Sequence, residues 1–336
     1  RIDQEEEGND DDNIDEMDIE SNSNQFISSM KEFSPLAPGD IATNDVERIA
    51  IEQKSRAKVC ISKLRKRYSD GKLAVKNLSL AMLEGEITCL LGANGAGKTT
   101  TIGVLTGLVN KTNGLVQIFG NNIDNDLTNI RSMTGICPQQ NVLVATLTVS
   151  EHLYIFGQIK GLYGDELKNA VNVIIADVGL TEKKDILSSA LSGGMKRKLC
   201  LSIALIGDPK FVLLDEPTSG MDPFSRRSTW ELLMKYKKGR VIVLTTHFME
   251  EADTLGDRIA IMSDGKLRCA GSSLFLKTRY GAGYVLSMVR NKDAKKMIKD
   301  EDEDEDIEEN ENDNDNENTD IIEKIEKRAI DGSNQE

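Results

Sequence analysis

The residues Gly92-Ala-Asn-Gly-Ala-Gly-Lys-Thr99 decide the fold class of this chain, because they follow the spacing G-x-x-x-x-G-K-[ST]. Its glycines let the backbone curl until successive N–H groups face one centre, and a helix predicted over 98–108 adds its positive end. Such a loop binds phosphates: Lys98 can reach the β- and γ-phosphates and Thr99 can ligate Mg²⁺. The residues expected at the nucleotide are Gly92, Asn94, Gly95, Ala96, Gly97, Lys98, Thr99 and Thr100.

A short apolar run, Phe211-Val-Leu-Leu-Asp215-Glu216, supplies the expected partner of this loop. A continuous apolar run of this length is typical of a strand buried on both faces of a parallel sheet. Asp215 at the strand end is placed to hold Mg²⁺, directly or through water. Glu216 follows it, where a carboxylate can activate water for in-line attack on the γ-phosphate.

The most diagnostic segment is Leu191-Ser-Gly-Gly-Met195, which lies shortly before that strand. Two glycines at the start of a helix free backbone N–H groups to meet an anion, and the Ser192 hydroxyl adds a donor. We therefore expect Ser192, Gly193 and Gly194 to contact a phosphate. By itself, Ser-Gly-Gly would be an unremarkable helix cap, and its position in the chain distinguishes it.

Working outward from the loop, the patterns predict strands on both sides and a helical region between them. Thr148 and Glu151 are spaced as a capping box, and Asp264-Gly265 is a turn signal between two short strands. The predicted strands are 58–64, 74–82, 86–91, 115–119, 133–137, 211–215, 241–245, 259–262 and 266–270, and about 146–206 is mostly helical. The chain shows no internal repeat, so one nucleotide-binding unit is expected.

Together these segments resemble the ABC (ATP-binding cassette) ATPase family, whose signature is the Leu-Ser-Gly-Gly sequence. The resemblance implies roles for further residues. Gln139 matches the Q-loop glutamine near Mg²⁺ and the attacking water, and Asp222 ends a stretch that matches the D-loop. His247 matches the switch histidine at the γ-phosphate, and Tyr68 matches the aromatic residue that stacks on adenine. His152 has no counterpart and is expected at a helix surface or in the core.

Within that family the resemblance is closest to subfamily A of eukaryotic ABC transporters. It runs from about residue 58 to 290. It rests on the stretches 91–101, 136–143, 191–199, 222–227 and 271–277, for example Ile-Cys-Pro-Gln-Gln-Asn-Val-Leu over 136–143.

The resemblance implies an α/β P-loop core with an antiparallel β-subdomain and a helical subdomain at about 140–207. It also implies that ATP and Mg²⁺ are bound, and that two cassettes, in one parent chain or as a dimer, pair head to tail. Ser192 of one then serves the ATP held by Lys98 of the other. The pair drives transmembrane domains, mostly for lipid transport, from the cytoplasmic face of a membrane.

Two other classes of function stay open at this point. A soluble ABC ATPase acting on ribosomes or DNA would use the same motifs, although such proteins usually carry two cassettes or a long coiled coil, and neither is found here. A regulatory nucleotide sensor with an inactive site is disfavoured because Glu216 and His247 are both present. No nucleic-acid partner is expected.

The charge of the chain is concentrated at its two ends. Residues 1–20 contain 11 acidic side chains and one basic one, and residues 300–320 contain 14 acidic and no basic ones. The whole chain carries −14, so the remainder carries +10, which suits an anionic ligand. Dense acidic runs repel themselves and bury little. We therefore expect an acidic disordered segment and linker over 1–56, the nucleotide-binding domain over 57–290, and an acidic low-complexity tail over 291–336.

Cysteine spacing and hydropathy exclude other classes of protein. The five cysteines are far apart and form no CxxC pair, and the chain has two histidines. A disulfide framework or zinc site is therefore not expected, and a reducing cytosolic setting fits. No apolar run reaches the roughly 18 residues that span a bilayer. Because the chain begins at Arg1, we expect it to be part of a longer protein.

Overall fold

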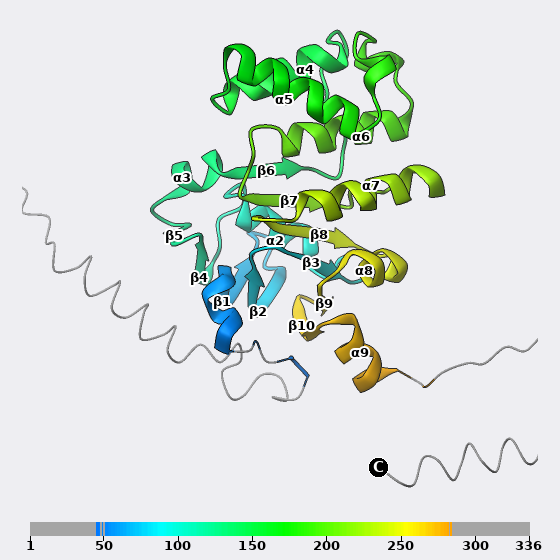
Figure 1. The fold of residues 1–336 in the computed structure, drawn as a ribbon. Coiled ribbons are helices and arrows are strands. Elements are labelled where there is room, and N and C mark those ends of the chain that lie inside the picture. Colours follow the sequence, from blue (N-terminus) through cyan, green and yellow to red (C-terminus); the bar gives the residue numbers. More distant parts are fainter. Residues whose placement is uncertain (1–44, 48, 50, 282, 284–336) are drawn as a thin grey trace, which may run out of the picture. The chain divides into compact units, whose positions relative to one another are not determined.

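A six-stranded sheet forms the centre of the fold in a computed structural model, which describes residues 45–281, except 48 and 50, together with residue 283 (Figure 1). Its strand order is β10-β9-β3-β8-β7-β6. The strands are β3 (Glu86–Leu91), β6 (Thr134–Cys137), β7 (Phe211–Asp215), β8 (Val241–Thr246), β9 (Arg258–Ser263) and β10 (Lys266–Gly271). Parallel pairing from β6 to β9 places the carboxyl ends of β3, β7 and β8 at one edge of the sheet.

The apolar runs in this sheet are buried on both faces, as their composition predicts. Along β7, Val212 and Leu214 belong to one hydrophobic core, whereas Phe211 and Leu213 belong to a second core on the other face. This alternation explains why every residue of β7 and β8 is buried. The predicted hairpin is confirmed: β9 and β10 are antiparallel, and both turn residues have positive φ, 52° at Asp264 and 74° at Gly265.

The second core lies between this sheet and an antiparallel sheet of order β2-β1-β4-β5. Its strands are β1 (Ala57–Arg67), β2 (Leu73–Leu83), β4 (Asn113–Ile118) and β5 (Asn121–Asn122). Helix α2 (Lys98–Leu105) follows the phosphate loop and contributes Ile102, Val104 and Leu105 to the same core. A short helix, α3 (Leu127–Ser132), follows β5.

Three helices form a separate group at the top of Figure 1. They are α4 (Val149–Ile159), α5 (Gly164–Asp177) and α6 (Gly193–Leu205), with short 3₁₀ turns η2 (Thr181–Lys183) and η3 (Ser188–Ala190) between the last two. The predicted capping box opens α4: Thr148 Oγ1 accepts from the Glu151 N–H, and the Glu151 carboxylate accepts from the Thr148 N–H. His152 on α4 is fully buried, which places it in the core.

Three further helices follow β7 in the sequence: α7 (Pro223–Tyr236), α8 (Met249–Leu255) and α9 (Ser273–Tyr280). A 3₁₀ helix, η1 (Ile51–Arg56), precedes β1. The described structure begins earlier than the expected start at residue 57, because the Glu47 N–H donates to Ala270 O over 2.8 Å and its carboxylate accepts from Ser272. Outside the described residues lie residues 1–44 of the acidic segment and linker predicted over 1–56, and all of the acidic tail predicted over 291–336.

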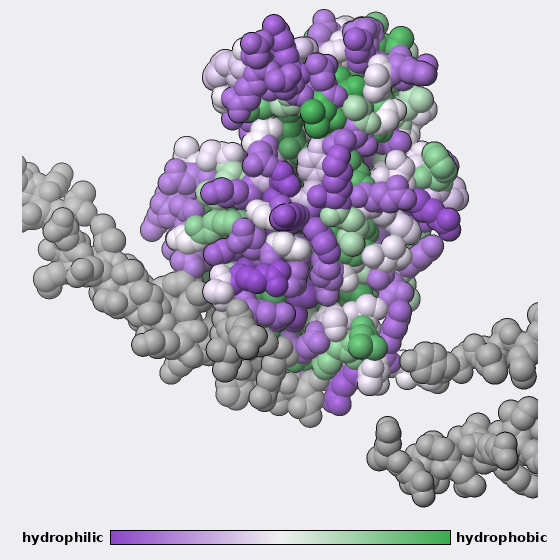
Figure 2. All heavy atoms as spheres, viewed as in Figure 1, coloured by the Kyte–Doolittle hydropathy of each residue, from purple (hydrophilic) through white to green (hydrophobic). Residues whose placement is uncertain are grey.

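Figure 2 shows one face of the described part, on which hydrophilic residues predominate and hydrophobic ones are scattered. Within residues 45–281, no helix combines the length and the hydropathy needed to cross a membrane.

Candidate active site

The phosphate loop lies between the end of β3 and the start of α2, where two glycines are required for different reasons. Gly97 is the N-cap of α2 with φ of 99°, a left-handed conformation that strains other residues. A Cβ at Gly97 would also lie 2.6 Å from the Ala74 carbonyl oxygen. At Gly92 a Cβ would lie 2.4 Å from Met262 O, so the loop backbone packs directly against neighbouring strands.

Lys98 is buried against this loop. Its Nζ donates to Gly92 O over 2.7 Å and to Ala93 O over 3.1 Å. Burial lowers the pKa of Lys98 from its ordinary value, and the charges of Glu216 and Asp215 oppose that shift. The ammonium group is therefore held at the centre of the loop, close to two carboxylates that favour its charged form.

A cavity of about 310 Å³ opens in front of the loop and collects most of the predicted ATP-binding residues. Its lining comes from β1, β2, the loop, α2 and the ends of β6 and β7. The predicted residues that line it are Tyr68, Asn94, Gly95, Gly97, Lys98, Thr99, Thr100, Gln139 and Glu216.

Tyr68 lies at the end of β1 with an exposed side chain, and its hydroxyl is 3.3 Å from Thr100 Oγ1. The Nζ of Lys66 lies 5.0 Å from the centroid of the Tyr68 ring. The ring is thus tied to the first turn of α2 and lies at the cavity, where a flat aromatic base can stack on it.

Asp215 and Glu216 lie at the end of β7 and are both buried. The backbone of Glu216 has φ of 49°, a left-handed conformation that costs a non-glycine residue about 1–3 kcal/mol and tends to occur at functional sites. The Glu216 N–H donates to Thr245 Oγ1 over 3.0 Å and to Thr245 O over 3.2 Å. These bonds hold Glu216 in that conformation.

The carboxylate of Glu216 lies between two other predicted catalytic side chains. Gln139 Nε2 donates to Glu216 Oε2 over 3.3 Å, and His247 Nδ1 lies 3.2 Å from Glu216 Oε1. Gln139 follows β6, Glu216 follows β7 and His247 follows β8. Parallel pairing therefore assembles the three groups at one edge of the sheet.

The residues predicted to hold Mg²⁺ also lie near one another. Thr99 Oγ1 donates to Asp215 Oδ1 over 3.5 Å, and the Thr245 hydroxyl donates to the same carboxylate oxygen. Hydroxyl, carboxylate and amide oxygens of Thr99, Asp215 and Gln139 are the donors that Mg²⁺ prefers, and it needs few protein ligands when phosphates complete its shell. Among the described residues no cluster of three His, Cys, Asp or Glu side chains suits a metal held by protein alone.

The Ser-Gly-Gly segment and Asp222 lie at a different cavity, of about 420 Å³. Ser192 is the N-cap of α6, and its side chain accepts from the Met195 N–H over 3.3 Å. Asp222 caps α7, and a hydrogen bond from the Ser225 N–H lowers the pKa of its carboxyl. No residue lines both cavities, so the described fold does not bring Ser192 and Lys98 to one place.

Some predicted residues line neither cavity. The Ala96 side chain packs in the core, and Asp215 lies buried beneath the loop. The others in this group are Gly92, Gly193 and His247.

Three residues at the site were not predicted from the sequence. Thr245 contacts both acids of the site, and its place two residues before His247 is a signal that points to it. Lys72 and Ala74 line the first cavity from the start of β2, and nothing in their local sequence indicates this position.

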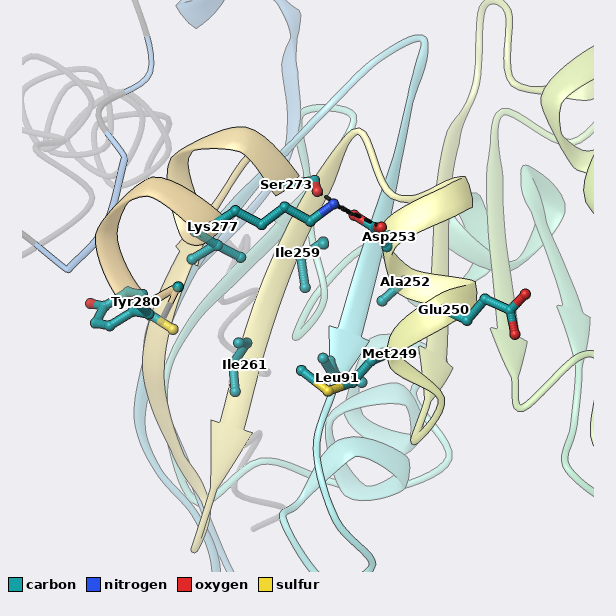
Figure 3. Close-up of a pocket in the computed structure, with 13 residues that line it drawn as sticks. Leu91, Met249, Glu250, Ala252, Asp253, Ile259, Ile261, Ser273, Lys277 and Tyr280 are labelled. Atoms are coloured by element: carbon teal, nitrogen blue, oxygen red, sulfur yellow. Dashed lines mark hydrogen bonds and ion pairs between the residues drawn. The ribbon is translucent and has the colours of Figure 1, made fainter. Parts of the chain in front are cut away.

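A third cavity, of about 360 Å³, is apolar and lies between α8, α9 and the sheet (Figure 3). Lys277 of α9 pairs with Asp253 of α8 over 2.7 Å at its edge. Its apolar walls include Ala252, Ile259 and Ile261, and none of the residues predicted for ATP or Mg²⁺ lines it.

Comparison with known proteins agrees with this arrangement. Residues 75–219 match the family model of the ABC transporter. The chain is 50% identical over 248 residues to ABC transporter A family member 6 of Dictyostelium discoideum, covering 73% of this chain and 15% of that protein. It is 52% identical over 230 residues to the human phospholipid-transporting ATPase ABCA3, covering 68% of this chain and 14% of that protein.

Solved structures give the same result for the fold. An ATP-binding subunit of an ABC transporter matches with a TM-score of 0.62 and 26% identity, over 66% of this chain and 93% of that one. The dimeric ATP-binding cassette MJ0796, in a post-hydrolysis state with ADP and Pi, matches with a TM-score of 0.59 and 26% identity, over 67% of this chain and 100% of that one.

The chain spans only 14–15% of the length of the two curated relatives, so it corresponds to one part of such a protein. Fold, loop and sequence matches agree that this part belongs to the ABC transporter family, as a nucleotide-binding ATPase domain similar to those of subfamily A.

Proposed function

We propose that this domain binds Mg-ATP in the cavity of the phosphate loop and hydrolyses it with Glu216 as the general base. The observation that carries the proposal is the placement of the Glu216 carboxylate at that cavity, between Gln139 and His247. A carboxylate at this point can accept a proton from water as the water attacks the γ-phosphate. Gln139 orients that water, and His247 contacts the γ-phosphate.

Binding is assigned to residues of the loop and its surroundings. Tyr68 stacks on adenine, and the loop amides with Lys98 hold the phosphates. Thr99, Asp215 and Gln139 would hold Mg²⁺, which neutralises charge that develops on the phosphate oxygens. Asn94, Gly95 and Thr100 line the same cavity and complete the phosphate contacts.

We further propose that hydrolysis requires a second cassette, in the same parent chain or as a dimer. The separation of the Ser192 cavity from the Lys98 cavity supports this, because the exposed end of α6 faces no phosphate bound by its own chain. In a head-to-tail pair, Ser192, Gly193, Gly194 and Asp222 of one cassette close the site of the other. A solved relative, MJ0796, is described as a dimeric cassette.

Coupling to membrane domains is the third part of the proposal. The relatives are named as ABC transporters, and one as a phospholipid-transporting ATPase. Just after Gln139, Val142 and Val144 expose 71% and 54% of their surface, and exposed apolar side chains suit a partner surface. We propose that transmembrane domains dock here, at the cytoplasmic face of a membrane, and that the transported substrate is a lipid. A soluble ATPase acting on ribosomes or DNA is not favoured, because the curated relatives are transporters.

Phosphate release and sizing chromatography of the Glu216→Gln chain together test the assignment of the general base and the pairing of two cassettes. Glutamine keeps the size of Glu216 but cannot take a proton, so turnover should fall by about 10²–10⁴-fold while ATP still binds. With hydrolysis blocked, ATP should shift the chain to a dimer, ADP should not, and adding Ser192→Arg should abolish the shift. Wild-type turnover in Glu216→Gln would contradict the base assignment, and a monomer at high concentration would contradict pairing between copies.

A further inference from the structure

Arg197 is a buried cation whose five N–H groups each meet a different backbone carbonyl. Its Nε donates to Pro217 O over 3.0 Å, its Nη1 to the carbonyls of Pro138 and Gln139, and its Nη2 to those of Asp215 and Glu216. The side chain is 2% exposed. A guanidinium has five donors in a fixed plane, so its hydrogen-bonding capacity is fully used here.

These carbonyls belong to the two segments that carry the catalytic side chains. Gln139 O accepts over 3.1 Å and Glu216 O over 2.8 Å, while the side chains of these two residues bond to each other over 3.3 Å. The guanidinium therefore fixes the backbone on both sides of the Gln139–Glu216 contact.

Glu216 needs such a restraint because of its left-handed backbone conformation. Strained conformations persist only where the surroundings determine them from several directions. Thr245 holds the N–H of Glu216, and Arg197 holds its carbonyl oxygen. Without Arg197, the Glu216 carbonyl oxygen loses its charged donor and keeps the bond from the Ser219 N–H over 3.1 Å, so the backbone that aims the carboxylate is less restrained.

Arg197 also connects this cluster to the Ser192 cavity. It lies on α6, whose first turn carries Ser192 and Gly194, and α6 packs against β6 and β7 (Figure 1). A displacement of α6 therefore acts directly on the backbone of Glu216 and Gln139.

We propose that Arg197 is a positioning residue for ATP hydrolysis, which holds the base Glu216 and its partner Gln139 in register and ties both to α6. This inference rests on the proposed function of Glu216. It assigns no contact between Arg197 and ATP, so it predicts an effect on turnover rather than on nucleotide affinity.

Arg197→Lys in the full 336-residue chain tests the proposal. Lysine keeps the charge but has three donors at one point, so it cannot hold carbonyls spread over five positions. We expect kcat to fall by about 10- to 100-fold, the scale of a small misplacement of a catalytic group. The Kd for ATP and cooperative unfolding should be retained. The matched control is Arg240→Lys. Arg240 is half-buried and donates to the Tyr236 carbonyl at the opposite end of β8, so kcat of this variant should not change.

A double-mutant comparison separates positioning from a merely structural role. In the Glu216→Gln background, Arg197→Lys should cause no further loss of turnover, because the group that it positions is already inactive. An unchanged kcat in Arg197→Lys, or an equal fold-loss in both backgrounds, would overturn the proposal.

If Arg197→Lys does not fold, Arg197→Gln repeats the comparison. Failure of both to fold would also overturn the proposal, because Arg197 would then be needed for the fold itself. If Glu216→Gln alone keeps wild-type turnover, the proposed function of Glu216 fails instead, so the two failures are distinguishable.

Discussion

The hydroxyl of Thr218 donates to the carboxylate of Glu251 over 2.7 Å in the interior of the protein. Trp230 Nε1 donates to the same oxygen over 3.3 Å, and Glu251 is 1% exposed. Thr218 lies two residues after Glu216, and Glu251 lies four residues after His247. One buried carboxylate thus joins the loop of the predicted base to the helix that follows the predicted switch histidine.

Replacement of Glu251 by alanine should destabilise the fold by about 2–4 kcal/mol, because two buried donors lose their acceptor. Urea denaturation measures this as a lower midpoint. Glu251→Gln keeps an acceptor oxygen at the same place and should cost less. An equal loss in both variants would show that the charge of Glu251, and not its hydrogen bonds, is what the fold requires.

Gln139→Ala and His247→Ala should each lower turnover by about 10- to 100-fold and weaken ATP binding by a much smaller factor. Both side chains contact the Glu216 carboxylate, whereas most of the proposed phosphate contacts come from the phosphate loop. Phosphate release and calorimetry give the two quantities separately. Gln158→Ala on the exposed surface of α4 is the matched control for glutamine removal. A large loss of affinity with unchanged kcat would assign these residues to binding.

Gly97→Ala should abolish ATP binding and lower thermal stability. The added Cβ would lie 2.6 Å from Ala74 O, in addition to the cost of a φ of 99°. Gly239 also has positive φ, 71°, but a Cβ there meets nothing within 4 Å. Gly239→Ala should therefore cost only about 1 kcal/mol, the ordinary cost of left-handed backbone, with binding intact. Equal effects at the two positions would argue against steric pressure on the loop.

The five free cysteines, all buried, should resist alkylation at pH 8 until the protein unfolds. Burial raises the pKa of Cys60 to about 11 and that of Cys137 to about 12, so their reactive thiolate forms are scarce. Because unfolded thiols ionise near pH 8.5, stability should fall as the pH rises above that value. Mass spectrometry with iodoacetamide, with and without urea, measures the protection. Fast labelling of the native chain at these two cysteines would contradict the burial.

Sequence motifs were sufficient to predict those parts of the structure that depend on residues close together in the sequence. The phosphate loop, the Thr148 capping box and the Asp264-Gly265 hairpin each depend on neighbouring residues, and the structure contains all three. Helix α2 ends at Leu105 rather than at 108, because Gly107 adopts a φ of 65° and Leu108 and Val109 donate back to Gly103 O. Such a glycine stop is readable from the sequence.

Three parts of the fold and site were not predicted. Helix α7 was missed although its start carries a readable signal, since Asp222 caps it and Pro223 opens it. Helices α8 and α9 are short, and α9 buries only Leu276, so neither gives a clear periodicity. The contact of Gln139 with Glu216 joins residues 77 apart and depends on the register of β6 on β7, which no local pattern contains.

The separation of the Lys98 cavity from the Ser192 cavity has a genetic consequence. If cassettes pair head to tail, a chain with Lys98→Ala and a chain with Ser192→Arg are each inactive alone, because each spoils every composite site in its own homodimer. Mixed together, they form heterodimers in which the intact loop of one chain meets the intact Ser192 end of the other. Two loss-of-function alleles of one domain would then complement each other, restoring one working site per pair.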